Sequence, residues 1–145
     1  MADNKIQFNI QRVYVKDASF ESPMSPNVFT EMSTAPKIGF NFESNTTKMN
    51  DETYELCLNF TVKAELENDI LYLLELKQCG VFSLTAADED LKKRLLNVHC
   101  AEIVYPYARE NISHIIQKGG FPPLFISPVD FHTIYQNELD KRKSD

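Results

Sequence analysis

Glycine is scarce in this sequence, and long apolar runs are missing. The four glycines form no G-x-x-x-x-G-K-[ST] pattern, so no backbone cradle for nucleotide phosphates is predicted. The longest uninterrupted apolar run, residues 70–74, is far shorter than the roughly 20 residues of a membrane span. Residues 1–5 lack the apolar core of a secretion signal and the character of a transit peptide. We therefore expect a soluble protein that uses no nucleotide, is not exported by itself and does not insert into membranes.

Cysteine and histidine are also few. The cysteines are three in number, widely spaced and without a C-x-x-C pair: Cys57, Cys79 and Cys100. This spacing predicts neither a disulfide framework nor a zinc site. A reducing cytosol is the expected setting. The histidines, His99, His114 and His132, lack metal-ligand spacing, so we expect no metal and no cofactor. His99 beside Cys100 has no evident third orienting group, so thiol catalysis is not predicted and the protein is not expected to be an enzyme.

Positive charge is in deficit. The formal net charge of −6 argues against binding to a phosphate backbone, so nucleic acid is not an expected partner. With 145 residues, 43% of them hydrophobic, the chain fits one globular domain. We expect this single domain to cover residues 1–145, with frayed ends at about 1–6 and 141–145.

Strand periodicity is clearest in the middle of the chain. From Tyr54 to Leu66 every even position is apolar, which predicts a strand with one buried face. A turn at residues 67–69 and a second strand over residues 70–77 complete an expected hairpin, with Leu74 and Leu76 on one face and Leu71, Leu73, Glu75 and Lys77 on the other. Shorter alternations predict strands around residues 38–42 and 8–19. In the latter, Phe8, Ile10 and Tyr14 are expected on one side, and Val13, Val15 and Asp17 on the other.

Helical patterns follow the strands. Pro106 suits a first helical turn, an apolar stripe follows at Ala108, Ile112, Ile115 and Ile116, and Gly119-Gly120 ends the predicted helix. A second helix is predicted with Ser127 as N-cap, Pro128 at the first position and a stripe at Phe131, Ile134, Tyr135 and Leu139. A shorter helix is expected around residues 88–98. Strands followed by helices indicate an α+β fold, a four-stranded antiparallel sheet with two main C-terminal helices packed on one face.

Two segments are apolar but interrupted by proline. Residues 20–36 contain Phe20, Met24, Val28, Phe29 and Met32, and residues 121–126 contain Phe121, Leu124, Phe125 and Ile126. Because proline removes backbone donors, these side chains are expected on loops, where they would form an apolar groove with adaptable walls. The alternative is that both loops fold down over the core.

The uncovered sheet face suggests a second surface. Asp17 and Glu21 share a side if the first strand stays extended, and Glu75 lies beside Leu73 on the last strand. Carboxylates next to apolar residues fit a docking surface for a basic, partly hydrophobic partner. The alternative is a set of solvated charges without a partner.

Several blocks resemble the SecB family of preprotein chaperones. Residues 8–23 (FNIQRVYVKDASFESP) are similar to the opening strand of that family, residues 103–110 (IVYPYARE) to its most recognisable block, and residues 120–124 with 127–131 to the closing one. The similarity runs in order from about residue 8 to residue 135. The chain departs from the family at Cys79-Gly80, where many members have two glycines, in lacking a tryptophan in residues 32–36, and in its short basic end.

The resemblance implies a function and an assembly. It implies an ATP-independent holdase of the cytosol that keeps unfolded preproteins translocation-competent and delivers them to SecA. It also implies a homotetramer, a dimer of dimers, in which the first strand pairs across the dimer and the long helix lies between dimers. Alternatives are a chaperone dedicated to one client such as an antitoxin, and a structural oligomer without a client.

The resemblance also implies roles for individual residues. The client groove would involve Phe29, Phe40, Phe121, Leu124, Phe125 and Phe131. SecA docking would involve Asp17, Glu21 and Glu75, with Leu73 nearby. The tetramer interface would involve Ile112, Ile115 and Ile116.

Overall fold

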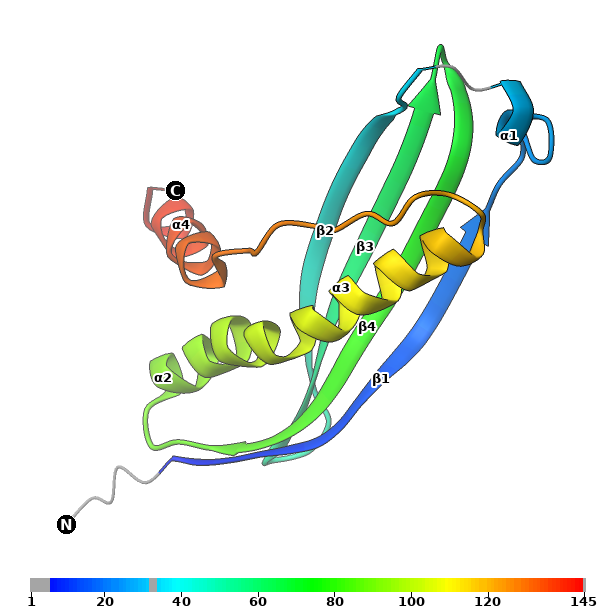
Figure 1. Ribbon diagram of the computed structural model, residues 1–145. Helices are drawn as coiled ribbons and strands as arrows, with labels where there is room; N and C mark the ends of the chain where they lie inside the picture. Colours follow the sequence, from blue (N-terminus) through cyan, green and yellow to red (C-terminus); the bar gives the residue numbers. More distant parts are fainter. Residues whose placement is uncertain (1–5, 32–33, 145) are drawn as a thin grey trace.

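Four strands form one antiparallel sheet in the computed structural model, which describes residues 6–31 and 34–144. The strands are β1 (Gln7–Glu21), β2 (Lys37–Lys48), β3 (Thr53–Leu66) and β4 (Asp69–Thr85), in the order β1-β4-β3-β2. A long helix crosses one face of this sheet obliquely, and none of the described residues forms a helix on the opposite face (Figure 1). The expected α+β class and the four-stranded antiparallel sheet are confirmed. Met32 lies outside the described residues.

The central hairpin follows the predicted alternation. The even positions of β3 from Tyr54 to Ala64 are all buried. Leu66 pairs with Asp69, and Glu67 and Asn68 between them have φ angles of 51° and 74°, the backbone of a tight hairpin turn. β4 runs well past Lys77, where the prediction ended it. Gly80 lies on this extension, and a Cβ there would lie 2.8 Å from the Phe82 ring and 3.0 Å from Val104, so glycine lets the helix approach the sheet.

Bulges change which face some residues occupy. The register of β1 against β4 shifts between Ile10 and Arg12 and again between Val15 and Asp17. Phe8 therefore pairs with Leu84 on the helix-covered side, whereas Tyr14 pairs with Cys79 and points to the other face. The prediction that Phe8 and Tyr14 share a face is wrong for this reason.

The same effect places Leu71. An irregularity in β4 leaves this residue without a pairing partner on β3, since Glu65 pairs with Ile70 and Ala64 with Tyr72. Leu71 is fully buried in the core instead of lying on the open face with Leu73 and Glu75, as predicted.

The long helix begins much earlier than predicted. α2 (Glu89–Arg94), the π-helical segment η1 (Leu95–His99) and α3 (Cys100–Lys118) follow one another without a break. Asp88 caps the start, its side chain accepting a 3.0 Å hydrogen bond from the Asp90 backbone N–H. Pro106 lies inside α3 rather than in a first turn, and the two helices expected on either side of it are one. The predicted end at Gly119-Gly120 is confirmed.

One side of α3 packs on β3 and β4. Ala108, Ile112 and Ile116 have no exposed surface, while Ile115 is half-buried. Ile112 and Ile116 thus belong to the core of the subunit, and of the three isoleucines predicted at a tetramer interface only Ile115 retains surface for another chain. A polar link spans the same layer, since Gln78 is buried, accepts from Asn111 (2.6 Å) and donates to the Tyr14 carbonyl (3.1 Å).

The last helix stands apart from the sheet. α4 (Phe131–Ser144) starts later than predicted, because Asp130, not Ser127, accepts the Thr133 backbone N–H at 3.1 Å. α4 lies against η1, and Arg94 covers the Tyr135 ring at 5.3 Å. Figure 1 shows α4 beyond the edge of the sheet, so the long helix provides most of the cover of the sheet face.

A short helix, α1 (Val28–Glu31), precedes β2. None of the described helices combines the length and apolarity of a membrane span.

Candidate binding surfaces

Aromatic rings gather where β1, β4 and the end of α3 meet. We call this group, Phe20, Phe29, Tyr72 and Phe121, the β1-side cluster. Phe121 contacts Tyr72 and Phe29 with ring centroids 5.0 and 5.3 Å apart. Glycine suits both positions before Phe121: a Cβ at Gly119 would lie 2.4 Å from the Phe20 ring, and Gly120 has a φ of 90°, which favours glycine. Phe121 is buried, whereas Phe29 is 50% exposed.

A second aromatic group lies where β2, β3, α3 and the start of α4 meet. We call this group, Phe40, Phe42, Phe60, Tyr105 and Phe131, the β2-side cluster. Phe131 contacts Tyr105 at 5.6 Å and Phe42 at 5.8 Å between ring centroids. Phe131 is buried and Phe40 is 38% exposed, 5.9 Å from the Phe60 ring. Tyr105 and Phe131 also line a cavity of about 210 Å³ with Pro106, Pro128 and Val129.

An irregular segment, residues 121–130, joins the two clusters. It runs from the end of α3 to the start of α4 across the helix layer (Figure 1). Phe125 is 69% exposed beside a hollow of about 360 Å³ on the outer side of α3, Leu124 is half-buried, and Ile126 is buried. The segment therefore combines both interpretations: some of its apolar side chains complete the core and others face solvent.

The predicted groove residues divide in the same way. The exposed ones are Phe29, Phe40 and Phe125; Leu124 is half-buried; Phe121 and Phe131 are buried within the subunit. Two of the exposed rings rest on buried aromatic neighbours, Phe29 on Phe121 and Phe40 on Phe60. That these residues bind a client stays a prediction.

The open face of the sheet brings the predicted docking residues together. Asp17 pairs with Lys77, Ser19 with Glu75 and Glu21 with Leu73, so the odd-numbered residues of both strands lie on the same face. The three carboxylates are exposed and Leu73 is half-buried. We call Asp17, Glu21, Leu73 and Glu75 the acidic patch. Its role in docking stays a prediction.

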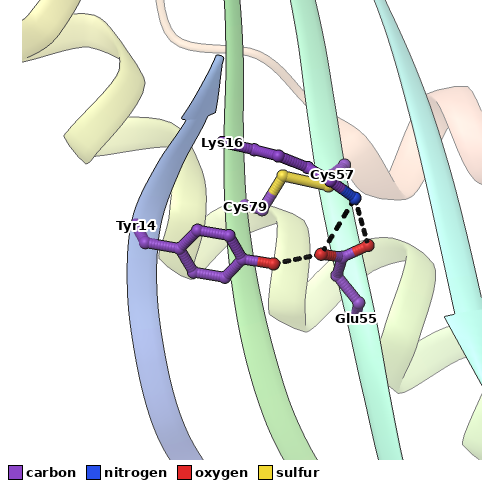
Figure 2. A network of polar contacts seen from close by, with 5 residues as sticks. All are labelled: Tyr14, Lys16, Glu55, Cys57 and Cys79. Atoms are coloured by element: carbon purple, nitrogen blue, oxygen red, sulfur yellow. Dashed lines mark hydrogen bonds and ion pairs between the residues drawn. A yellow bond between two sulfur atoms is a disulfide. The ribbon is translucent and has the colours of Figure 1, made fainter. Parts of the chain in front are cut away.

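A polar network that the sequence did not predict lies further along this face. The Tyr14 hydroxyl donates to Glu55 Oε2, and Lys16 Nζ lies 3.2 Å from Glu55 Oε1 (Figure 2). Desolvation and the hydrogen bond to the Glu55 carboxylate raise the pKa of Tyr14 to about 12. The same hydrogen bond and the Lys16 ammonium lower the pKa of Glu55.

A disulfide lies beside this network. Cys57 and Cys79 are bonded to each other, which corrects the prediction that the cysteines are unpaired. The register of β3 and β4 sets the two residues directly opposite each other. Their sulfur atoms and the Glu55 carboxylate lie within 4.8 Å, but sulfurs bonded to each other are not thiolates and do not fit a metal in this state.

The third cysteine, Cys100, is buried, and burial raises the pKa of its thiol to about 12, which opposes a catalytic role.

Comparison with known proteins identifies the family. The family described as SecB, preprotein translocase subunit SecB, matches residues 1–142. The chain belongs to the SecB family. Protein-export protein SecB of Methylococcus capsulatus is 40% identical over 133 residues, covering 92% of this chain and 85% of that protein. Protein-export protein SecB of Marinobacter nauticus is 39% identical over 142 residues, covering 98% and 86%.

A solved structure supports the SecB-like fold. A Mycobacterium tuberculosis SecB-like chaperone, solved in complex with a peptide from an antitoxin, superimposes with a TM-score of 0.68. The two chains share 12% sequence identity, and the match covers 84% of this chain and 90% of the other. Family membership over nearly the full length makes this chain a protein-export chaperone of the SecB type, which is not an enzyme.

Proposed function

We propose that this SecB-family chaperone holds unfolded preproteins in the cytosol on the exposed rings of its two aromatic clusters and of the segment 121–130 that joins them, and hands them to SecA. The observation that supports client holding is the exposure of Phe29 and Phe125, at 50% and 69%. Covering one phenylalanine side chain contributes about 1.5–3 kcal/mol. Each ring adds a weak site, and several along one extended client add up to useful avidity.

Selectivity for unfolded chains follows from the spacing of these sites. Phe40 lies on the edge strand β2, whereas Phe29 belongs to the cluster that contains Phe20 of β1, the other edge strand. A folded client hides its apolar side chains, whereas an extended chain can offer them to both clusters. Binding to the unfolded state then delays folding by mass action, which requires no nucleotide.

We assign the docking of SecA, which would take over the client, to the acidic patch. Asp17, Glu21 and Glu75 lie on the sheet face that is opposite the helix, so a partner could dock there while the client stays in place. Carboxylates beside Leu73 fit a basic partner with apolar side chains of its own.

We also propose a homotetramer built as a dimer of dimers. β1 is an edge strand, and its Ile10 and Val15 are 51% and 45% exposed, which suits pairing with a second copy of β1. Tyr107 is 50% exposed on α3 and gives the helix an apolar outer surface with Ile115. Ile112 and Ile116 are not part of this surface, because their side chains are buried between α3 and the sheet.

Refolding of an unfolded preprotein tests client holding. We expect an excess of the chaperone to slow refolding, and the double variant Phe29→Ala/Phe125→Ala to slow it at least several-fold less. Met49→Ala is the matched control, because Met49 is 57% exposed in the turn between β2 and β3, away from both clusters. Unchanged refolding with the unmodified chaperone would refute the proposal. If the double variant and Met49→Ala slow refolding equally well, the assignment of client binding to Phe29 and Phe125 is refuted.

A further inference from the structure

The Cys57–Cys79 disulfide links the two central strands on the open face of the sheet. The residues are a directly opposed pair of β3 and β4, with Cα atoms 4.1 Å apart. Because the sheet itself holds them together, the sulfurs stay adjacent whether or not they are bonded. The pair can therefore open and close without rearrangement of the fold.

Both cysteines are buried, Cys57 at 6% exposure and Cys79 at 0%, but only Cys57 lines a cavity. Cys57 lines a cavity of about 110 Å³ on the open face, together with Glu55, Asn59 and residues of β1, β2 and β4. Cys79 is fully buried and does not line this cavity. A small thiol entering from the open face would therefore reach Cys57 first.

The charges around the cavity suit an anionic peptide thiol, of which only the thiol end would enter a space of about 110 Å³. Lys16 and Lys77 both line it, against one acidic residue, Glu55, whose carboxylate is already held by Tyr14 and Lys16. Ammonium groups beside a sulfur stabilise a thiolate and attract carboxylates. Asn59 Oδ1, on the same wall, is buried without a hydrogen-bond partner and could accept a peptide N–H. Two lysines at this position disfavour a divalent cation at the reduced pair.

We propose that Cys57 and Cys79 form a reversible exchange couple with an anionic peptide thiol of the glutathione class. In reduction, the glutathione thiolate attacks Cys57 Sγ, the bond to Cys79 breaks, and Cys79 leaves as a thiolate. A second glutathione thiolate then attacks the glutathione sulfur of the mixed disulfide, which frees Cys57 and yields glutathione disulfide. Oxidation reverses both steps, so two protein thiols and one glutathione disulfide give one protein disulfide and two glutathiones.

Trapping the intermediate tests the order of attack. The native protein is incubated in buffers of defined glutathione ratio, quenched with acid, alkylated and mapped by mass spectrometry. We expect the disulfide to equilibrate with the buffer, Cys79→Ser to accumulate glutathione on Cys57, and Cys57→Ser to accumulate none on Cys79 until denaturant is added. Cys100 serves as an internal control and stays unmodified in the native protein. No exchange before unfolding, or a mixed disulfide on Cys79 in the wild type, would overturn the proposal.

The role of charge is tested separately. Lys77→Met should slow exchange with glutathione several-fold and leave exchange with the neutral thiol 2-mercaptoethanol nearly unchanged. Lys63→Met is the matched control, since Lys63 is on β3, pairs with Glu65 at 2.8 Å and does not line the cavity. If both lysine variants behave like the wild type with glutathione, the cavity does not recognise the anion and the assigned ligand class is wrong.

Discussion

Glu55 connects groups that lie far apart in the sequence. Its carboxylate on β3 accepts from Tyr14 of β1 across the intervening β4 and pairs with Lys16. The folded state lowers the pKa of Glu55, so this stabilisation is complete above the ordinary value of 4.5 and is lost as the pH falls through the folded value. The raised pKa of Tyr14 sets the upper limit, since stability is complete below 10.0 and is lost as the pH rises through about 12.

Removing the Tyr14 hydroxyl tests this link. We expect Tyr14→Phe to lower the free energy of unfolding by about 1–2 kcal/mol at neutral pH, because the carboxylate loses a charged hydrogen bond. The difference should shrink as the pH falls below 4.5 and through the lowered pKa at which the folded Glu55 takes up a proton. Urea unfolding at one protein concentration and several pH values measures it, with Tyr72→Phe as control, because burial and not a carboxylate raises the pKa of Tyr72. A difference independent of pH would contradict the assigned bond.

Charge reversal at Glu75 tests the acidic patch. We expect Glu75→Lys to weaken SecA binding at least tenfold, because an ammonium replaces a carboxylate of the proposed docking surface for a basic partner, and to leave client holding intact. Titration calorimetry with SecA and the refolding assay give the two measurements. Asp51→Lys, an equal charge change in the exposed turn between β2 and β3, is the control. Equal loss of both activities would show that the two surfaces are not separate.

Sequence reasoning found the acidic patch but missed the disulfide, and the reason lies at single residues. Alternation within each strand, a local property, puts Asp17 and Glu21 on one side and Glu75 beside Leu73, and the family resemblance joined the three carboxylates in one surface. The cysteine pair depends on register: in an unbroken hairpin from the Leu66–Asp69 pair, Cys57 would face Gln78. The extra residue at Leu71 moves its partner to Cys79. Nothing in the period of the strand signals that bulge.

At the scale of elements, the approach of helix to sheet depends on one glycine. We expect Gly80→Ala to lower the free energy of unfolding by about 1–3 kcal/mol, because the new Cβ overpacks Phe82 and Val104. Gly39→Ala is the matched control on β2, where the nearest atom to a Cβ would be 3.8 Å away, so we expect little change or a slight gain. Chemical denaturation of both variants shows whether close packing or the conformational freedom of the glycine backbone determines the change in the free energy of unfolding. Equal losses would show that close packing is not the cause.

Strands and helix ends were predicted correctly where the apolar pattern was continuous. Helix starts were misplaced where a single proline was given more weight than the surrounding pattern. The alternation of β3 and the glycines after Lys118 were sufficient. Pro106 led to a helix start, yet the stretch from Asp88 onward is already helical, so the proline sits within α3. Ser127-Pro128 likewise resembled a helix start, but the Ser127 carbonyl accepts from the Tyr105 hydroxyl, and the segment stays irregular until Asp130 caps α4.

At the scale of the whole molecule, the assembly is testable by mass. We expect sedimentation to give a species of four chains, and Tyr107→Glu to reduce it to two, because a carboxylate would be buried between the long helices. Met49→Glu places the same charge on an exposed turn and should keep four chains. A monomeric wild type would contradict the proposed dimer of dimers and leave the β1 edge open.

The acidic patch exists only in the folded chain. Asp17 comes from the first strand and Glu75 from the last, and pairing of β1 with β4 is what brings them to one face. A copy still emerging from the ribosome, or one that has lost its structure, presents apolar segments much like those of any preprotein but not this arrangement of charges. A motor that reads the arrangement can thereby tell the carrier from its cargo, even when both are copies of the same polypeptide.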